Sequence, residues 1–279
     1  MKDRVKHSLV VAFQGERGAY SESAVHAFFG EDVIPKPCRT FREVFQEVVD
    51  GKSDYGVVPI ENSIEGSVNQ VYDLFMEFDL KVCGEVILKI EHCLIANPGT
   101  KIENIKVIYS HPQALAQCRN FLEELGCEMI STYDTAGSVK MIKERGIFNA
   151  GAIASERAAE IYGMSIIARD IADNPNNYTR FFILHEEDSP PTGEDKTSII
   201  FSTKHVPGAL YRALEEFAIR NINLTKIESR PTKQKPWEYN FYLDFEGHRN
   251  ECRCMEALSS LRKKTTFLKI LGSYPKARK

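Results

Sequence analysis

The sequence predicts an α/β protein with two lobes built on parallel or mixed sheets, followed by a smaller C-terminal module. Short apolar segments alternate with amphipathic helical patterns over 8–185, and this strand-then-helix order favours parallel or mixed sheets. An acidic, proline-containing stretch at 186–196 has the composition of a linker. Beyond it, residues 197–274 follow the order strand, helix, strand, strand, helix, strand. We therefore expect a larger region, a linker and a separate module.

Length and charge limit the classes of function. With 279 residues, of which 43% are apolar, the chain can bury a sizeable core and is long enough for about two domains. The formal net charge is −3 and lysines and arginines form no long run, so we expect no nucleic-acid partner. The apolar run at 9–13 is too short for a signal peptide or a membrane span, which predicts a cytoplasmic protein with no membrane partner.

The seven cysteines predict buried, reduced thiols rather than disulfides, because their number is odd and their spacing irregular. Cys252 and Cys254 lie closer together than the usual zinc ligands, and no second Cys or His pair follows them. We therefore expect no metal site.

The first expected element is a buried strand at 8–13, followed by a turn between Gly15 and Gly18 and a helix that starts near Ser21. The start of such a helix offers unpaired amides and a positive dipole end to an anion. The glycine loop is equally consistent with simple turn chemistry. A capping box at Thr40 predicts the second helix.

Polar residues follow the next strand, which we expect at 55–60. Glu61, Asn62 and Ser63 lie shortly before another amphipathic helix that begins near Val68. Open α/β sheets bind ligands at the carboxyl ends of strands and the amino ends of helices, so all three residues are site candidates. The alternative is that Asn62 or Ser63 only organises the turn.

The second lobe begins after a break at 97–100, where we expect a crossing between lobes. Ser110-His111-Pro112 follows a short strand and opens a helix with proline near its first position. His111 could protonate a leaving group, but a turn-forming or core histidine is at least as good an explanation, and we leave it out of the catalytic set. The lobe continues with expected strands at 129–133, 151–154 and 165–168, a helix that follows Asp134 to Ser138, and a helix at 157–162.

The chain returns to the first lobe through an Asn-Pro turn, after which Asn177, Thr179 and Arg180 stand at the mouth of an apolar strand. A guanidinium can hold a carboxylate through two hydrogen bonds, while a neighbouring hydroxyl donates or accepts at the reacting centre. An exposed Thr-Arg pair entering a core strand is the alternative. The two crossings would make lobes that face each other across a cleft, with Thr179 and Arg180 at the hinge.

Eight short motifs are spaced along nearly the whole chain. They are Gly15-Glu16-Arg17-Gly18-Ala19-Tyr20-Ser21, Val58-Pro59-Ile60-Glu61-Asn62-Ser63, Ser110-His111-Pro112-Gln113-Ala114-Leu115 with Gln117-Cys118, Thr135-Ala136, Ala152-Ile153-Ala154-Ser155, Asn177-Tyr178-Thr179-Arg180-Phe181, Gly208-Ala209-Leu210 and Glu228-Ser229-Arg230-Pro231. The first six together resemble the prephenate dehydratase family of phenylalanine biosynthesis, and the last two resemble its ACT regulatory domain. One departure is Gly137-Ser138-Val139, where the family is expected to have a more alanine-rich helix start.

The resemblance implies a fold and an activity. The catalytic region at 8–185 would resemble a two-lobed periplasmic binding protein, with lobe 1 at about 8–96 plus 179–185 and lobe 2 at about 101–178, followed by a ferredoxin-like ACT domain. Family members convert prephenate to phenylpyruvate, a carbon–oxygen lyase reaction that needs no cofactor, and phenylalanine inhibits them. With no mutase segment at the start and no dehydrogenase segment at the end, the chain resembles the monofunctional form.

For the catalytic site, the resemblance implies that Thr179 hydrogen-bonds or protonates the leaving hydroxyl while Arg180 holds a carboxylate. An alcohol is a poor general acid, so we expect Thr179 to act by hydrogen bonding within a network or by proton relay. Neutral donors would orient the substrate, and Glu61 would supply a proton or fix its neighbours. The expected catalytic residues are Thr179, Glu61, Asn62, Ser110 and Gln113, and the expected substrate contacts are Ser21, Ser63, Thr135, Ala136, Asn177, Arg180 and Phe181.

For the ACT module, the resemblance implies an allosteric L-phenylalanine site shared between subunits of a homodimer or homotetramer. Gly208 lets backbone approach a ligand closely, and charges at a strand end could face an amino-acid zwitterion. A solvated ion pair at that strand end is the alternative. The expected site residues are Gly208, Ala209, Leu210, Asn223, Leu224, Glu228, Ser229, Arg230 and Pro231.

Two other functions are compatible with the sequence. An amino-acid sensor would keep the cleft and the arginine, but it has no need for a hydroxyl at position 179 or for the Asn62 and Gln113 donors. Arogenate dehydratase acts on a substrate with an amino group in place of the keto oxygen. An acidic partner for that ammonium would discriminate between the substrates, and the sequence does not identify one.

Overall fold

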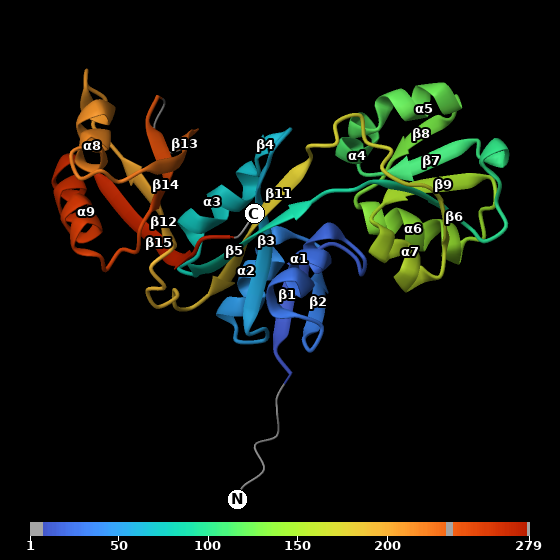
Figure 1. Ribbon diagram of the computed structural model, residues 1–279, viewed down its shortest axis with the longest axis horizontal. Helices are drawn as coiled ribbons and strands as arrows, with labels where there is room; N and C mark the ends of the chain where they lie inside the picture. The colour runs from blue at the N-terminus through green and yellow to red at the C-terminus, as the bar shows by residue number, and fades with distance from the viewer. Residues whose placement is uncertain (1–7, 233–236, 278–279) are drawn as a thin grey trace, which may run out of the picture. The chain divides into compact units, whose positions relative to one another are not determined.

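The computed structural model describes residues 8–232 and 237–277 (Figure 1). The chain divides into two compact units. The first unit contains Met1–Leu74 and Val86–Phe181, and the second contains Phe75–Glu85 and Phe182–Lys279. The sequence did not indicate that Phe75–Glu85 belongs with the C-terminal residues. The second unit is therefore discontinuous in sequence.

The first strands along the chain belong to a sheet with the order β2-β1-β3-β11-β5, in which β4 also pairs with β3. β1 is parallel to both β2 and β3, so the carboxyl ends of these three strands lie at one edge. The strands are β1 (Val10–Gln14), β2 (Ile34–Cys38), β3 (Tyr55–Asn62), β4 (Gly66–Ser67), β5 (Lys81–Lys89) and β11 (Tyr178–His185), and the helices between the first five are α1 (Tyr20–Phe29), α2 (Phe41–Val49) and α3 (Asn69–Glu77).

A second sheet, whose strands all belong to the first unit, has the order β10-β6-β9-β7-β8. β7 is parallel to β8 and β9, whereas β6 is antiparallel to β9 and β10, so the sheet is mixed as predicted. Its strands are β6 (Cys93–Ala96), β7 (Val107–Ser110), β8 (Glu128–Ser131), β9 (Ala150–Ala154) and β10 (Ser165–Ala168), and its helices are η1 (Ile102–Asn104), α4 (Pro112–Gln117), α5 (Arg119–Leu125), α6 (Thr135–Glu144) and α7 (Glu156–Tyr162).

Capping side chains start three helices of the first unit. The side chains of Thr40, Asp134 and Ser155 each accept a hydrogen bond from the backbone N–H three residues later, at 3.2, 2.7 and 3.2 Å. The capping box at Thr40 predicted the first of these. The single helix expected after Pro112 is instead divided at Cys118, where φ is −116° and ψ is 23°.

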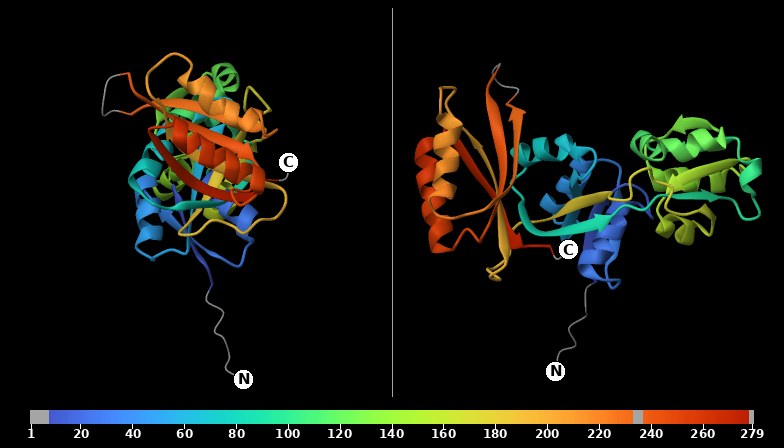
Figure 2. Two further views of the ribbon diagram at one scale, coloured as in Figure 1. Left: turned by 90° about the vertical axis from the view of Figure 1, so that its left-hand side faces the viewer. Right: turned by 45° about the horizontal axis from the view of Figure 1, so that its top comes forward.

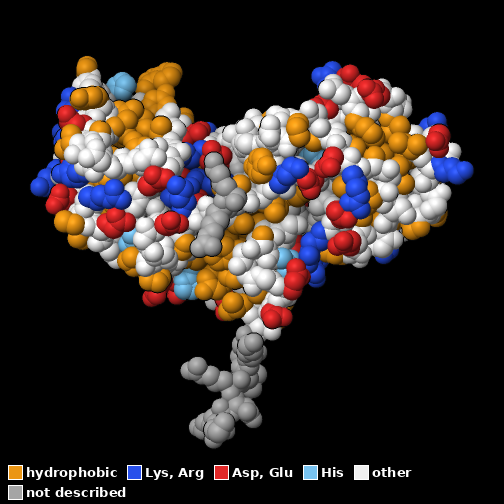
Figure 3. Space-filling model, in the orientation of Figure 1, with side chains coloured by type: hydrophobic (Ala, Val, Ile, Leu, Met, Phe, Trp, Pro, Cys, Tyr) orange, Lys and Arg blue, Asp and Glu red, His pale blue; other side chains and the backbone are white. Residues whose placement is uncertain are grey.

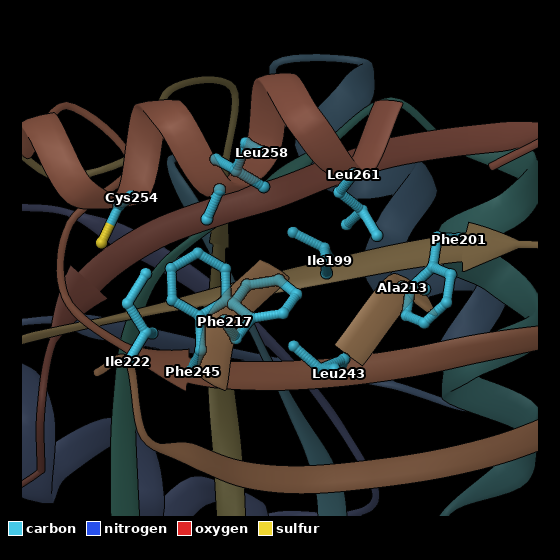
Figure 4. Close-up of a cluster of buried hydrophobic side chains, with 11 residues drawn as sticks. Ile199, Phe201, Ala213, Phe217, Ile222, Leu243, Phe245, Cys254, Leu258 and Leu261 are labelled. Carbon is cyan, nitrogen blue, oxygen red and sulfur yellow. The ribbon is translucent and has the colours of Figure 1, made fainter. Parts of the chain in front are cut away.

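The second unit contains a four-stranded antiparallel sheet in the order β13-β14-β12-β15, with two helices against one face (Figure 2). Figure 4 shows its core, in which Phe217 and Leu261 of the helices lie toward Phe245 and Ile199 of the sheet. This is the predicted βαββαβ order of a ferredoxin-like module. The elements are β12 (Asp195–Ser202), α8 (Ala209–Ala218), β13 (Leu224–Pro231), β14 (Tyr239–Glu246), α9 (Cys252–Lys264) and β15 (Phe267–Pro275).

Residues Phe75–Glu85 pack with the C-terminal residues of the second unit. The rings of Phe75 and Phe182 lie 6.2 Å apart between centroids, and Lys196 Nζ lies 2.8 Å from Glu85 Oε1. The Nζ of Lys269 donates to two backbone carbonyls of the segment 75–78, at 3.0 and 2.8 Å. The early segment therefore supplies both core and polar partners to this unit.

All seven cysteines are free thiols, and four of them are buried, as their number and spacing predicted. Within the two described ranges, no helix is long and apolar enough to cross a lipid bilayer.

Candidate active site

A cavity of about 570 Å³, which we call the cleft, lies in the first unit. The end of β3, the start of β11 and the starts of α1, α4 and α6 all contribute side chains to its wall, so both sheets of the unit take part. Open α/β proteins bind ligands where strands end and helices begin. The volume is in the range typical of small-molecule sites.

The structure brings six of the expected residues to the cleft wall. Side chains alternate between the two faces of a strand, so Thr179 and Phe181 of β11 point to one face and Arg180 to the other. The six residues are Ser21, Asn62, Gln113, Thr135, Thr179 and Phe181.

The other expected residues do not line the cleft. Arg180 is 9% exposed, and its Nη2 lies 3.5 Å from Glu61 Oε2, so the arginine pairs within the protein. Ser110 is fully buried and donates to a backbone carbonyl of β9 at 2.7 Å. Ser63 bonds to the backbone just before β11 and at its first residue, and Ala136 is buried in α6. Direct contact of these residues with a ligand stays a prediction.

Asn62 orients the hydroxyl of Thr179. Its Nδ2 donates to Thr179 Oγ1 at 3.0 Å, while its Oδ1 accepts the backbone N–H groups of Ile64 and Glu65 at 2.9 and 3.0 Å. These two backbone donors fix which amide atom is oxygen. The Tyr178 carbonyl lies 3.2 Å from the same nitrogen, farther than Thr179 Oγ1 at 3.0 Å. With the Thr179 oxygen accepting from Asn62, its own hydrogen is available to donate into the cleft.

Further hydrogen bonds connect this pair through Asn177, an expected site residue, to Gln117, His92 and Tyr20, which the sequence did not identify as site residues. Asn62 Nδ2 donates to Asn177 Oδ1 at 2.7 Å, and Asn177 Nδ2 donates to Gln117 Oε1 at 2.8 Å. The same Gln117 oxygen lies 2.9 Å from Nε2 of His92, whose Nδ1 lies 2.8 Å from the hydroxyl of Tyr20. Gln117 stood inside a recognised motif, whereas nothing in the local pattern singled out His92.

The loop that carries Gly15 and Gly18 reaches residues of the other sheet. Glu16 accepts hydrogen bonds from the Tyr133 hydroxyl at 2.8 Å and from Lys140 Nζ at 3.0 Å. Burial opposes ionisation of Glu16, but these two bonds outweigh it and lower its pKa. Ser155 Oγ also donates to the Gly18 carbonyl at 2.6 Å. The loop thus links the two parts of the wall.

Asp134 places a carboxylate on the cleft wall that the sequence analysis did not select. It is 8% exposed, and burial raises its pKa, while hydrogen bonds from the backbone of Gly137, Glu16 and Ala136 oppose that shift. His111 also lines the cleft, and its Nδ1 accepts from Gln113 N at 3.3 Å. This is the turn-forming role that the sequence analysis weighed for it.

In the second unit, the two expected regulatory signatures lie on different elements, and the second is paired with β14, whose Tyr239 and Phe241 line the same cavity as Ala209 and Leu210. Gly208 has a φ of 77° and precedes α8, and Ala209 and Leu210 line a cavity of about 150 Å³. Glu228, Ser229, Arg230 and Pro231 belong to β13 and do not line that cavity in the described residues. Asn223 Nδ2 donates to Glu246 at 3.2 Å, and Leu224 lines a separate apolar cavity.

Comparison with known families finds two matches. A family model described as prephenate dehydratase matches residues 11–189, and one described as ACT domain matches residues 197–261.

Individual relatives agree with these matches. A bifunctional chorismate mutase/prephenate dehydratase of Aquifex aeolicus is 48% identical over 276 residues, which cover 98% of this chain and 75% of that protein. Arogenate dehydratase 2 of Petunia hybrida is 46% identical, covering 96% of this chain and 72% of the relative. The crystal structure of prephenate dehydratase from Arthrobacter aurescens in complex with L-Phe has a TM-score of 0.89 at 33% identity, covering 96% of this chain and 90% of the other.

Proposed function

Because this chain belongs to the prephenate dehydratase family, we propose that it converts prephenate to phenylpyruvate, water and carbon dioxide. The bond between the ring and its carboxylate breaks, the electron pair enters the ring, and the ring hydroxyl leaves with its bonding pair. One proton turns the departing hydroxide into water. Since the ring becomes aromatic, the protein needs to supply alignment and help for the leaving group.

One observation carries the proposal: the Thr179 hydroxyl faces the cleft and accepts from Asn62 at 3.0 Å. Its hydrogen is therefore aimed at a bound ligand, where it would donate to the departing hydroxyl as negative charge develops there. Assistance of this kind is worth about 100- to 10,000-fold in rate. An amino-acid sensor has no use for a hydroxyl prepared in this way.

The wall is suited to a carboxylate that must leave. Its hydroxyl and amide groups include Ser21 at the start of α1 and Thr135 at the start of α6, where helix dipoles favour an anion. Neutral donors stabilise a carboxylate less than a bidentate arginine does. The ring carboxylate is thus held in place without being strongly stabilised before it becomes carbon dioxide.

Phenylpyruvate formation from prephenate by the purified chain tests this function. We expect turnover by the wild-type protein and a rate about 100- to 10,000-fold lower in Thr179→Val, which keeps the side-chain shape but removes the hydroxyl. Prephenate binding without turnover by the wild type would contradict the proposal and favour the sensor.

We also propose that L-phenylalanine inhibits the enzyme through the ACT domain. The ACT match at 197–261 and the relative crystallised with L-Phe support this regulation. A site shared between two copies would bring Ala209 and Leu210 of one copy to the Glu228–Pro231 signature of another. Added phenylalanine should then suppress turnover, and unchanged turnover would contradict the regulatory proposal alone.

Exposed apolar surface on the second unit supports self-association as a homodimer or homotetramer (Figure 3). Tyr211 of α8 and Ile219, which follows α8, are 68% and 64% exposed beside an apolar cavity of about 360 Å³. The neighbouring strand β13 is at the sheet edge, where its backbone can pair with another copy. Light scattering should give a mass above that of one chain, and a monomer at every concentration would contradict this.

Arogenate is a second candidate substrate because Asp134 lies on the cleft wall. An ammonium group in place of the keto oxygen would gain from a nearby buried carboxylate. Asp134→Asn keeps the oxygen that accepts from Gly137 N at 2.7 Å, so α6 should remain capped. We expect this variant to lose arogenate turnover selectively. Equal losses with both substrates would indicate a structural role for the carboxylate.

A further inference from the structure

A buried histidine stands at the far end of the hydrogen-bonded chain that begins at Thr179. His92 is 2% exposed and immediately precedes β6, so it lies on the crossing from the first sheet to the second. Asn177 lies on the returning crossing, just before β11. Gln117, at the end of α4, contacts both residues through one oxygen atom. The hydrogen-bonded network therefore connects both crossings between the sheets to Thr179, the proposed catalytic residue.

The direction of every hydrogen bond in the chain follows from the backbone near Asn62. Two backbone N–H groups identify Asn62 Oδ1, so its Nδ2 must donate and the Asn177 atom it meets must be oxygen. Asn177 Nδ2 then donates to Gln117, and the atom it meets must also be oxygen. An oxygen cannot donate here, so Nε2 of His92 must carry a hydrogen and donate to it.

The surroundings of His92 agree with this tautomer. Burial lowers its pKa, and the hydrogen bond to Gln117 opposes that shift in part, which favours a neutral ring with one N–H. With the hydrogen on Nε2, Nδ1 is an acceptor, and the single hydrogen of the Tyr20 hydroxyl is shared between this nitrogen and the Glu91 carbonyl, both 2.8 Å away.

We propose that His92 is a positioning residue of the dehydratase: its Nε2–H holds Gln117 and Asn177, and through them it fixes Asn62 as the donor to Thr179. The hydrogen-bonded network is then fixed at both ends, by two backbone amides beside Asn62 and by His92. Without His92, the Gln117 oxygen keeps one of its two donors, and its side chain is free to leave Asn177. This inference rests on the proposed dehydratase activity.

Three substitutions separate the hydrogen bond from simple packing. The amide nitrogen of His92→Gln can reach the position of Nε2 and donate to Gln117. His92→Asn is one methylene shorter and reaches only the position of Nδ1, and His92→Leu has neither donor. We expect kcat for prephenate to fall about 10- to 100-fold in the Asn and Leu variants, with little change in KM, and to stay near wild type in the Gln variant.

The outcomes distinguish this inference from the proposed function. No turnover by the wild type would overturn the function itself, whereas wild-type turnover with an unaffected Leu variant would overturn only the role of His92. Equal losses of kcat in the Gln and Asn variants, or a change confined to the melting temperature, would also overturn the role of His92, because either result points to packing. If the Leu variant does not fold, the Gln and Asn pair still decides.

Nitrogen-15 NMR of the histidine rings in the wild-type protein adds a measurement that needs no variant. We expect the resonances of His92, assigned by their loss in His92→Gln, to show a neutral ring protonated at Nε2. A ring protonated at Nδ1 alone would overturn the inference, since it could not donate to Gln117.

Discussion

Replacing Asn62 with aspartate should reverse the hydrogen bond that prepares Thr179. The substitution keeps size and shape, and one carboxylate oxygen can still accept from the backbone at Ile64 and Glu65, so we expect the protein to fold. The other oxygen would stand where Nδ2 now lies, 3.0 Å from Thr179 Oγ1 and 2.7 Å from Asn177 Oδ1, so the Asn177 amide would have to turn over to donate to it. Two oxygens at that distance need a hydrogen between them, and at neutral pH only the threonine can supply it.

The size of the effect follows from the lost donor. With its hydrogen turned toward the new carboxylate, Thr179 can no longer assist the departing hydroxyl, a contribution of about 100- to 10,000-fold. This corresponds to about 3 to 5 kcal/mol of transition-state stabilisation. The new charge also faces an anionic substrate, so KM should rise as well. Protonation of the carboxylate restores a donor, and activity should recover in part as the pH falls.

Steady-state kinetics of a double-mutant cycle would measure this coupling. We expect Asn62→Asp and Thr179→Val to lower kcat by similar factors, and the double variant to be little worse than either, because Asn62 acts through Thr179. Circular dichroism and melting temperature would control for folding. Losses that multiply in the double variant, or an Asn62→Asp enzyme with wild-type kcat, would refute the reasoning.

Three further predictions concern other contacts. Gly18→Ala should cost about 1 to 3 kcal/mol of unfolding free energy, because φ is +87° and the new Cβ would lie 2.7 Å from Ala158 Cα. The matched control is Gly30→Ala, where φ is +80° and the space around the new Cβ is open. Equal shifts of the melting temperature in the two variants would contradict a role for the Ala158 contact. Glu16→Gln should raise KM more than it lowers kcat. Since the pKa of Glu16 is lowered, the stability that its ion pair contributes should be lost as the pH falls through that pKa. Urea titrations in which Glu16→Gln loses as much stability at acid pH as the wild type would count against this contribution. Arg230→Ala should weaken phenylalanine inhibition with little loss of turnover, and an unchanged inhibition curve would argue against a regulatory role.

Much of the fold could be predicted because its signals are local. Capping residues, strand periodicity and turn residues identified the two α/β sheets and the C-terminal βαββαβ module. Asn62 and Ser21 could be placed near a ligand for the same reason, since one lies at a strand end and the other at a helix start, where such folds bind ligands. Thr179 lies at the start of its strand, shortly after the Asn-Pro turn. The alternation of side chains along β11 was a further local signal, and it explains why Thr179 faces the cleft and Arg180 does not.

The rest depends on contacts between residues far apart in the chain. His92 sits in an apolar segment and becomes notable only because Tyr20, 72 positions away, and Gln117, 25 positions away, meet its two ring nitrogens. Asp134 stood between an expected strand and an expected helix, and only the cavity identifies it as part of the cleft wall. Ser110 followed a strand as expected, but its hydroxyl is buried against β9. Substrate preference, the oligomer and a cytoplasmic location stay predictions.

The discontinuous second unit has a consequence for the order in which the protein is made. Phe75–Glu85 leaves the ribosome before residues 86–181, yet Phe182, Lys196 and Lys269, with which it packs, are made only afterward. Until those residues are made, Phe75 lacks the ring of Phe182 against which it packs. A fragment cut at residue 182 would also lack the partners of both lysines. The C-terminal module therefore cannot be transferred to another protein by a cut in the sequence alone, because part of its unit comes from Phe75–Glu85.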